Sequence, residues 1–497
     1  MNDVVAWCVD ASLRACRVPP LNRTSVYALL GLAPAQRLFE RIAQRRAVAA
    51  FRDARRRCPA YARFLEAQGI SGNVSRKGFI TLPETTKQNY VTAYSIEDRC
   101  FGGAIPRRGV VIDESSGSSG TPNNWVRGPQ ERAGVRRLLE HAMTMRFRDR
   151  PVFLINCFAL GPWATGMNVT MSLAARCIVK SVGPDKPKLE NTLRTFGTRY
   201  EYAIAGYPPF IKDFLDTTTL DLSPYEMHLL VGGEGIAEPV RDRFLQAFKS
   251  VFSSYGASDL EINMAAESSL SIAIRRQCAA DPALCQAVFA RSEPPMLFQY
   301  NPIDYLIETN AASELIFTLL RPAYAAPRIR YNLRDVGGTF THRDLMRILR
   351  EHGVDVTTLP RGPAFPFLFV AGRSDLTVGF YGAKVYVADV DAAIAGDPEL
   401  RGRIHSFQMR VEHDAAHNER LRVDLERAAS VAGELDPATA HRAIFDGLLR
   451  VNQDFREVSK MFADDHVVVA IHPFGTGPFA GRDVRVKNRY IVDPPKP

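Results

Sequence analysis

Short apolar runs alternate with helix-like segments between residues 150 and 260, and this alternation constrains the fold more than any other feature of the sequence. The strand-like runs include PVFLINCFAL, RCIVKSVG and YEYAIAGYPP. Residues 227–259, MHLLVGGEGIAEPVRDRFLQAFKSVFSSYGASD, repeat the order strand, glycine turn, helix, strand and turn. Such alternation predicts βαβ units in a mostly parallel sheet that is covered on both faces. Ligands then bind beyond the carboxyl ends of the strands.

Length and patterning predict the domain organisation. A chain of 497 residues exceeds one ordinary hydrophobic core, so two or three domains are expected. Helical patterning such as AVAAFRDARRRCPAYARFLEAQG predicts a mainly helical lead-in within residues 1–95. From about residue 370 the sequence becomes more charged, and it ends in the proline-rich tail DPPKP. We therefore predict an α/β protein, with a large N-terminal domain (1–371) of mostly parallel sheets flanked by helices and a smaller α+β C-terminal domain (372–497), the boundary lying near Gly372.

The charge of the chain is compatible with several partners. A net charge of +9 suits polyanionic ligands such as nucleotides or coenzyme A, and also nucleic acid. The densest basic run, Arg41–Arg57, has apolar residues at helical spacing. It predicts a helix with a solvated basic face, and contact with phosphates or a membrane surface is the alternative.

Cysteines and the N-terminus indicate the compartment. The eight cysteines are scattered, which is typical of reduced cytoplasmic thiols rather than a disulfide framework. Cys278 and Cys285 are spaced more widely than the usual pair of a zinc site. Because the N-terminus lacks a long apolar run, we expect neither a signal peptide nor a membrane span, and hence a cytoplasmic protein.

The segment Asp113–Arg127, DESSGSSGTPNNWVR, carries the strongest chemical signal. It holds four serines, two glycines and a threonine in a short stretch between two ordered regions. Glycines let the backbone approach an anion closely, and hydroxyls with free N–H groups can bind polyphosphate oxygens. A phosphate-binding loop is one interpretation, and a flexible linker is the other. Neither GxxxxGK[ST] nor the GxSxG nucleophile elbow is present.

Ser115–Pro122, SSGSSGTP, resembles the SSGTTGxP phosphate loop of the adenylate-forming superfamily, in the branch of phenylacetate-CoA ligases and their CapK-like relatives. Further signatures follow in the order of that family over roughly the last four hundred residues. The segment GGE, Gly232–Glu234, resembles the GAEP element that lines the adenine pocket. It stands between an apolar strand and a helix, where helix N-terminal N–H groups suit nucleotide binding.

YGASD, Tyr255–Asp259, resembles the YGxTE element of the family. The resemblance implies that Tyr255 stacks on adenine, Ser258 contacts phosphate and Asp259 helps hold magnesium. Asp259 is one methylene shorter than the usual glutamate, which leaves Glu261 and Glu267 as alternative ligands.

Three later segments complete the resemblance. IRYNLRDV resembles the turn whose aspartate, here Asp335, binds the ribose hydroxyls, with Arg334 in place of the usual glycine. AGRSDLTVGFYGAKVY resembles the hinge motif, which implies that Arg373 meets ribose or phosphate, that Asp375 is the hinge, and that the turn at Gly382 enters the site in the second half-reaction. In GRDVRVKNRYIVD, Lys487 is the candidate for the adenylation lysine and Arg482 is its rival.

The resemblance implies a reaction in two steps. The carboxylate of an acid attacks the α-phosphorus of ATP, and a thiol or amine then attacks the acyl-adenylate. ATP, Mg²⁺ and CoA are the implied cofactors, and the C-terminal domain would be mobile. Transfer to a carrier-protein thiol or an amine is the alternative, and a non-catalytic nucleotide-binding relative is another. Nucleic acid is not an expected partner, and a homodimer is left open.

Two groups of residues are the predicted sites. The acid would lie in an apolar pocket, and the aromatic content mildly favours an aryl or other hydrophobic acid. The candidates for this pocket are Asn156, Cys157, Phe158, Trp163, Tyr207, Pro208 and Gly232. The predicted nucleotide-binding residues are Ser115, Ser116, Gly117, Ser118, Ser119, Gly120, Thr121, Gly233, Glu234, Tyr255, Gly256, Ser258, Asp335, Arg373 and Asp375.

Overall fold

The structure is a computed structural model and describes most of the chain. The described residues are 36–114, 123–161, 164–321, 324–373, 377–380, 383–413, 419–431, 433–452, 455–456, 459, 462–481 and 490.

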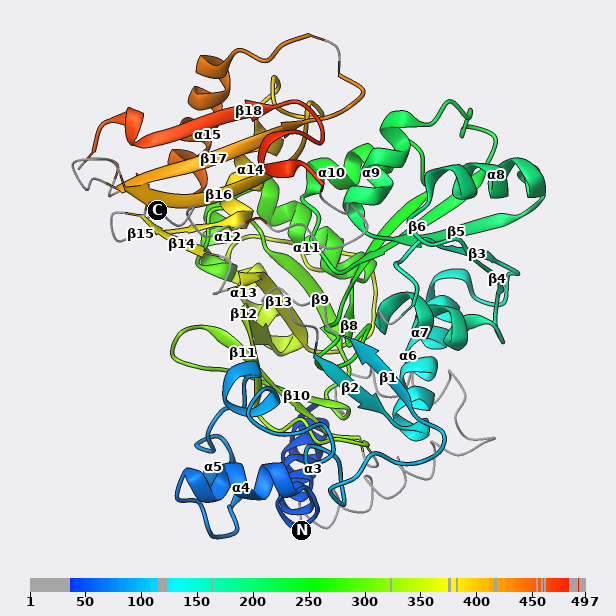
Figure 1. Ribbon diagram of the computed structural model, residues 1–497, viewed down its shortest axis with the longest axis vertical. Helices are drawn as coiled ribbons and strands as arrows, with labels where there is room; N and C mark the ends of the chain where they lie inside the picture. Colours follow the sequence, from blue (N-terminus) through cyan, green and yellow to red (C-terminus); the bar gives the residue numbers. More distant parts are fainter. Residues whose placement is uncertain are drawn as a thin grey trace.

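An 11-stranded sheet runs through the larger part of the molecule (Figure 1). Its strand order is β10-β11-β12-β13-β9-β8-β7-β6-β5-β3-β4. The parallel strands are β3 (Phe153–Asn156), β4 (Ile178–Ser181), β5 (Glu201–Gly206), β6 (Glu226–Gly232) and β7 (Ser250–Tyr255). The helices α7 (Ala164–Leu173), α8 (Lys186–Phe196), α9 (Pro208–Thr217) and α10 (Glu238–Phe244) alternate with them. The alternation predicted from the sequence is therefore confirmed, as is the α/β fold class.

Beyond β7 the pairing becomes antiparallel, so the parallel part of the sheet is limited to five strands. The antiparallel strands are β8 (Ala265–Ala266), β9 (Met296–Tyr300), β10 (Tyr305–Thr309), β11 (Glu314–Leu319), β12 (Tyr331–Phe340) and β13 (Phe367–Arg373). The short connection between β10 and β11 leaves no room for a crossover helix, and these two strands pair antiparallel. The helices of this half are α11 (Ser269–Ala280), α12 (Pro282–Phe289) and α13 (His342–Glu351).

Helices cover both faces of the parallel half. Leu154, Ala203 and Leu230 point to the face covered by α6 (Pro129–Phe147) and α7, where they share a core with Met143 and Val169. The alternate residues of the same strands, Ile155, Ile204 and Leu229, belong to the core on the opposite face, which includes residues of α8, α9 and α10. The result is a three-layer arrangement, and its strands end at the edge where Gly206, Gly232 and Tyr255 lie.

The N-terminal described part is helical, in keeping with the predicted lead-in. Its elements are α3 (Gln36–Arg57), α4 (Pro59–Ala67), α5 (Arg76–Phe79) and the short helical turn η2 (Lys87–Val91). The helix α3 buries Phe39, Ile42 and Phe51 at helical spacing, which confirms the helix predicted for the basic run. Arg46 departs from the predicted solvated face, because its side chain is buried and donates to the carbonyl of Ile303 at 2.6 Å.

The C-terminal part has a core of its own. Its strands are the hairpin β14 (Thr377–Phe380) and β15 (Ala383–Tyr386), and the sheet β16 (Ile404–His413), β17 (Glu419–Arg427) and β18 (Val467–His472). The helices α14 (Val387–Gly396) and α15 (Pro437–Val451) pack against them, and short 3-10 turns lie at Asp464–His466 and Gly477–Phe479. The boundary near Gly372 stays a prediction.

Hydrogen bonds join the C-terminal part to the large sheet and its helices. Lys212 Nζ of α9 donates to the carbonyl of Ile404 at 2.6 Å, and the Ser292 hydroxyl donates to the carbonyl of Val451. Figure 1 shows β16 to β18 at the upper left of the molecule, with the label of α10 beside them. Within the described residues, the structure contains no helix whose length and apolarity would suffice to cross a membrane.

Candidate active site

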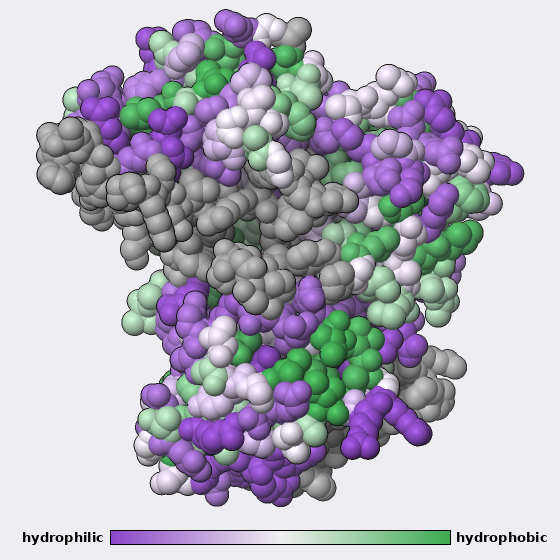
Figure 2. All heavy atoms as spheres, viewed as in Figure 1, coloured by the Kyte–Doolittle hydropathy of each residue, from purple (hydrophilic) through white to green (hydrophobic). Residues whose placement is uncertain are grey.

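The serine-rich loop is carried by a hairpin that the structure describes at its base. The strands β1 (Val111–Glu114) and β2 (Asn124–Arg127) pair antiparallel, with Glu114 opposite Asn124. Residues 115–122, which include the predicted phosphate-binding residues Ser115 to Thr121, lie outside the described residues. In Figure 2 a hydrophobic area lies over this hairpin, where Ile112 is 45% exposed. The hairpin therefore presents an apolar surface beside the loop.

The hairpin is fastened to the turn that follows β7. The guanidinium of Arg127 is buried, and it donates to Asp113 at 3.1 Å, to Glu131 at 2.9 Å and to the carbonyl of Leu260 at 2.6 Å. It also donates to the carbonyl of Ser258. Because buried charges are stable only when paired and hydrogen-bonded, Arg127 fixes the serine loop's base against the YGASD turn.

Asp259 connects this hairpin to β12. One carboxylate oxygen accepts a hydrogen bond from Trp125 Nε1 at 2.9 Å, and the other accepts one from the Tyr331 hydroxyl at 2.8 Å. Both donors are neutral, so they hold the carboxylate in place without compensating its charge. The alternative magnesium ligands differ, because Glu261 is paired with Arg321 and Glu267 with two arginines.

Tyr255 and Asp335, predicted to bind the same nucleoside, lie in contact. The hydroxyl of Tyr255 donates to the Asp335 carboxylate, and the Tyr255 ring stacks on Phe317 at 6.0 Å between centroids. Asp335 is 7% exposed, and its register partner on β13 is Arg373. Three predicted residues from distant parts of the sequence therefore meet at one place.

Arg334 occupies a strained backbone conformation just before Asp335. Its φ is +68°, a value that favours glycine, and glycine is the usual residue of the family at this position. The Arg334 amide donates to the Asn332 side chain at 2.7 Å, and its half-exposed guanidinium reaches Glu314 at 3.3 Å. The turn before Asp335 is therefore left-handed, with an arginine at the position where the sequence resemblance expects glycine.

Two glycines of the predicted site occupy positions where a larger residue would clash or strain the backbone. A Cβ at Gly256 would lie 2.6 Å from the amide nitrogen of Asn263 and 2.7 Å from the carbonyl of Glu261. Gly233 has φ of +86°, so the turn after β6 also needs glycine. These positions let the turns after β6 and β7 pack closely, with Glu234 and Ser258 on them.

The C-terminal segment reaches the turn after β6. The hydroxyl of Tyr490 donates to Glu234 at 3.4 Å, and the Tyr490 ring lies 4.9 Å from that of Phe407 on β16. Lys487 and Arg482 precede Tyr490 and lie outside the described residues, as do Asp375 and Gly382.

An apolar cavity of about 110 Å³ lies between the sheet and the helices α6 and α7. Of the predicted pocket residues, Phe158, Tyr207 and Gly232 line it, and Trp163 lies outside the described residues. Asn156, Cys157 and Pro208 do not line it. The Asn156 amide instead donates to the carbonyl of Gly166 at 2.8 Å. Other lining residues are Leu139, Met143, Arg146, Leu154, Val169, Leu230, Phe252 and Ile262.

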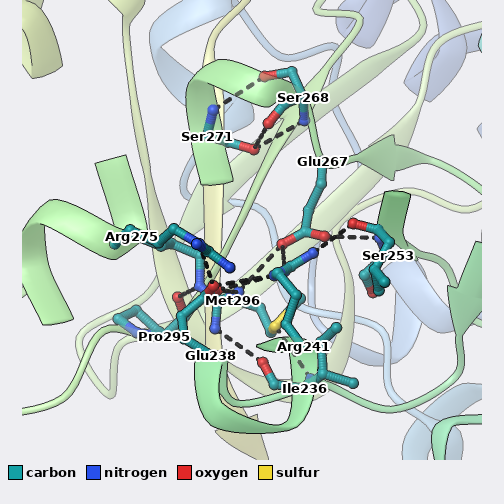
Figure 3. A network of polar contacts seen from close by, with 12 residues as sticks. Ile236, Glu238, Arg241, Ser253, Glu267, Ser268, Ser271, Arg275, Pro295 and Met296 are labelled. Atoms are coloured by element: carbon teal, nitrogen blue, oxygen red, sulfur yellow. Dashed lines mark hydrogen bonds and ion pairs between the residues drawn. The ribbon is translucent and has the colours of Figure 1, made fainter. Parts of the chain in front are cut away.

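A buried ionic network, which sequence reasoning missed, supports the turn after β6 (Figure 3). Glu267 accepts from Arg241 at 2.5 Å, from Arg275 at 3.2 Å and from the Ser253 amide at 2.7 Å. Glu238 pairs with both arginines as well. Arg275 also donates to the carbonyl of Ile236 at 3.0 Å. In the sequence these residues are isolated charges, which resemble solvated surface positions.

The sequence as a whole matches no protein-family profile. No curated protein is detectably similar to it in sequence.

Solved structures, in contrast, resemble the chain over nine-tenths of its length. A 2-hydroxyisobutyryl-CoA ligase in the postadenylation state, in complex with R3-HIB-AMP, matches with a TM-score of 0.64 and 15% identity, over 91% of this chain and 89% of that one. The same ligase with 2-HIB-AMP and CoA in the thioesterification state matches with a TM-score of 0.51 and 16% identity, over 92% and 90%. The chain therefore has the adenylate-forming ligase fold, with its large and small parts. This confirms the fold that the resemblance to the adenylate-forming superfamily implies, and the phenylacetate-CoA ligase branch stays a prediction.

Proposed function

We propose that the chain uses ATP to convert a carboxylic acid into an acyl-adenylate and then transfers the acyl group, with the thiol of CoA as acceptor. In the first step a carboxylate oxygen forms a bond to the α-phosphorus, and the bond to the pyrophosphate oxygen breaks. In the second step the thiol sulfur bonds to the acyl carbon and AMP leaves. Neither step needs a nucleophilic side chain, because the substrates supply the nucleophiles, so the protein acts by positioning and charge stabilisation.

One observation carries this proposal. The contacts from Trp125 to Asp259 and from Asp259 to Tyr331 connect the hairpin of the serine loop to β12, the strand that also carries Asp335. Asp335 is four positions after Tyr331, which is about 13 Å along a strand. That span is of the order of one nucleoside triphosphate. The proposal is that the loop binds the phosphates, and that Asp335 and Tyr255 bind the nucleoside.

Asp259 suits a magnesium ion better than the two alternative carboxylates. Its two oxygens accept hydrogen bonds from neutral donors. The negative charges of Glu261 and Glu267 are instead neutralised by ion pairs with arginines. Mg²⁺ is usually bound through one or two carboxylates together with substrate phosphates, and it neutralises phosphate charge there. Among the described residues, no group of three or more metal-binding side chains is present, so ATP itself would supply the remaining ligands.

The C-terminal part would act in the first step. Tyr490, which follows Arg482 and Lys487 in the sequence, contacts Glu234 in the turn after β6. The higher TM-score to the ligase in its postadenylation state supports the assignment of this arrangement to the adenylation half-reaction. Asp375 would be the hinge, and the Gly382 turn would enter for transfer.

Exchange of labelled pyrophosphate into ATP tests the proposal. With purified protein, Mg²⁺ and a panel of aryl, aliphatic and amino acids, exchange should depend on the acid. Product analysis with CoA, a carrier protein or an amine then identifies the acceptor. If no acid supports exchange while ATP still binds, the chain is a nucleotide-binding protein and the proposed reaction is wrong.

The adenylation lysine can be assigned by separating the two steps. Lys487→Ala should slow pyrophosphate exchange by 100-fold or more, on the order of one lost transition-state charge contact, and change transfer from a supplied acyl-adenylate little. Arg482→Ala is the matched control. Equal loss in both steps for Lys487→Ala, or the larger exchange defect in Arg482→Ala, would reassign the role.

A further inference from the structure

The apolar cavity extends inward from the strand ends. Gly232 lies opposite Ser254, and two residues earlier Leu230 lies opposite Phe252, and all four residues line the cavity. Two residues of a strand span about 7 Å, which is the approximate depth of the cavity along the sheet. An acid whose reacting carboxylate lies at the strand ends would therefore place its other end near Phe252.

Arg146 lies at this inner end. Its guanidinium carbon is 4.4 Å from the centroid of the Phe252 ring, and the residue lines the cavity. One terminal nitrogen donates to the carbonyl of Ala142 and the other to the carbonyl of Glu267, both at 3.1 Å. Its Nε is enclosed and has no hydrogen-bond partner among the described residues. Because a guanidinium has five N–H donors, two carbonyls leave it incompletely satisfied.

Arg146 also lacks an ion-pair partner of its own among the described residues, although the charge of Glu267 attracts it. Within the described part of the chain, Arg146 forms no ion pair, and the nearby Glu267 carboxylate is bound by Arg241 and Arg275. Glu238 and Glu267 together balance those two arginines and leave Arg146 as an additional cation. Burial lowers the pKa of Arg146 to about 10, which is the direction expected for a cation in apolar surroundings. It remains charged at neutral pH.

We propose that Arg146 binds the second carboxylate of a short dicarboxylic acid, while the first carboxylate reacts with ATP. A carboxylate supplies the hydrogen-bond acceptors and the charge that the site lacks, whereas a hydroxyl or keto oxygen supplies only an acceptor. The cavity extends only about 7 Å along the sheet from the strand ends to Phe252, so the acid is short. This assignment rests on the proposed adenylation reaction and replaces its hydrophobic acid by a charged one.

A purely structural role for Arg146 gives different expectations. The residue lies in the last turn of α6, where a cation interacts favourably with the helix dipole. In that case its replacement would weaken activity toward all acids alike. A role in substrate binding instead predicts a change of preference between acids of equal length.

The test is pyrophosphate exchange with matched five-carbon acids: glutarate, valerate and 5-hydroxyvalerate. Wild-type protein should favour glutarate over valerate in kcat/KM by about 10- to 100-fold, the value of one charge-assisted hydrogen-bonded contact. Arg146→Met keeps the stem against Phe252 and should abolish the preference while valerate exchange persists. Arg146→Lys keeps the charge and should retain part of the preference.

Arg136→Met is the matched control, because Arg136 is an exposed residue of the same helix, and it should leave the preference unchanged. Exchange with valerate or 5-hydroxyvalerate in preference to glutarate would overturn the inference and leave the proposed reaction intact. Equal loss for all three acids in Arg146→Met, with a native circular dichroism spectrum, would assign Arg146 a structural role. Exchange with no acid in the wide panel would refute both the inference and the proposed function.

Discussion

Replacement of Glu267 by glutamine tests whether the buried ionic network holds the large domain together. The Glu267 side chain is fully buried, and it accepts hydrogen bonds from two arginines and one backbone amide. Glutamine preserves the shape and one acceptor oxygen, but it removes the charge and presents an N–H₂ group to the arginine donors. Only Glu238 then remains to compensate Arg241 and Arg275.

The expected loss follows from the burial of these charges. Removal of one partner from a buried ion pair costs about 3–5 kcal/mol, because the other charge stays buried without compensation. A Coulomb interaction at about 4 Å with an effective dielectric constant of about 20 gives a similar figure, near 4 kcal/mol. The free energy of unfolding should therefore fall by about 3–5 kcal/mol in Glu267→Gln. With a urea dependence of about 3 kcal/mol per M, the midpoint falls by about 1 M or slightly more.

Urea unfolding at pH 7, followed by circular dichroism, measures this loss. Glu226→Gln is the control, because Glu226 forms an exposed ion pair with Lys249 at 2.6 Å on the neighbouring strand. Exposed pairs contribute little, so its midpoint should not move measurably. If Glu267→Gln unfolds at the same urea concentration as Glu226→Gln, the network does not have the energetic role assigned to it.

Two further predictions concern a strained turn and an interdomain contact. Arg334→Gly should be more stable than Arg334→Ala by about 1 kcal/mol in the same urea assay, because both lose the contact with Glu314 but only glycine accepts φ of +68° without strain; equal stabilities would contradict the strain. At Lys212, burial, together with the charge of Arg243, lowers the pKa from 10.5 to about 8, against the opposing effect of Asp391. The protonated lysine is therefore disfavoured where it meets Ile404, so domain contact should weaken as the pH falls through about 8 and be strongest toward pH 10.5. Energy transfer between dyes on the two domains, measured from pH 6.5 to 9.5, should show this trend in the native chain and lose it in Lys212→Met; the opposite slope would refute it.

Patterns of apolar residues within single segments predicted the alternating strands and helices of the parallel half and the helix α3. The alternation around PVFLINCFAL and the apolar spacing of α3 both reflect which side chains one element buries, and both predictions are confirmed. The antiparallel strands β8 to β13 were not predicted, because their pairing joins residues such as Asp335 and Arg373 that no local period relates. That Tyr255 and Asp335 lie close together could be expected only because both match nucleoside-binding motifs of the family that the sequence resembles.

The residues that sequence reasoning missed share one physical property. Arg127, Arg146 and Arg241 are single charged residues whose burial depends on partners far away in the chain, such as Leu260 for Arg127 and Phe252 for Arg146. Before the fold is known, a lone arginine near a helix end looks like any solvated residue. A charged residue that is flanked by apolar residues on both sides in the sequence is a weak indication of burial. This pattern does not identify the residue with which the charge pairs.

The change of pairing direction at β7 explains why the predicted nucleotide site and the predicted acid pocket both lie at the end of this strand. β7 is parallel to β6 but antiparallel to β8, so the chain leaves the sheet at Tyr255 and returns at Ala265. This connection carries Ser258 and Asp259 past the strand ends, where β12 and the β1–β2 hairpin contact it through Tyr331 and Trp125. Ligand sites in open α/β sheets form at such discontinuities, because neighbouring connections diverge and leave a crevice. Under the proposed function the nucleotide would occupy that crevice, and the reacting carboxylate and the α-phosphate would meet at the end of β7, from which the cavity lining runs inward to Phe252 and Arg146.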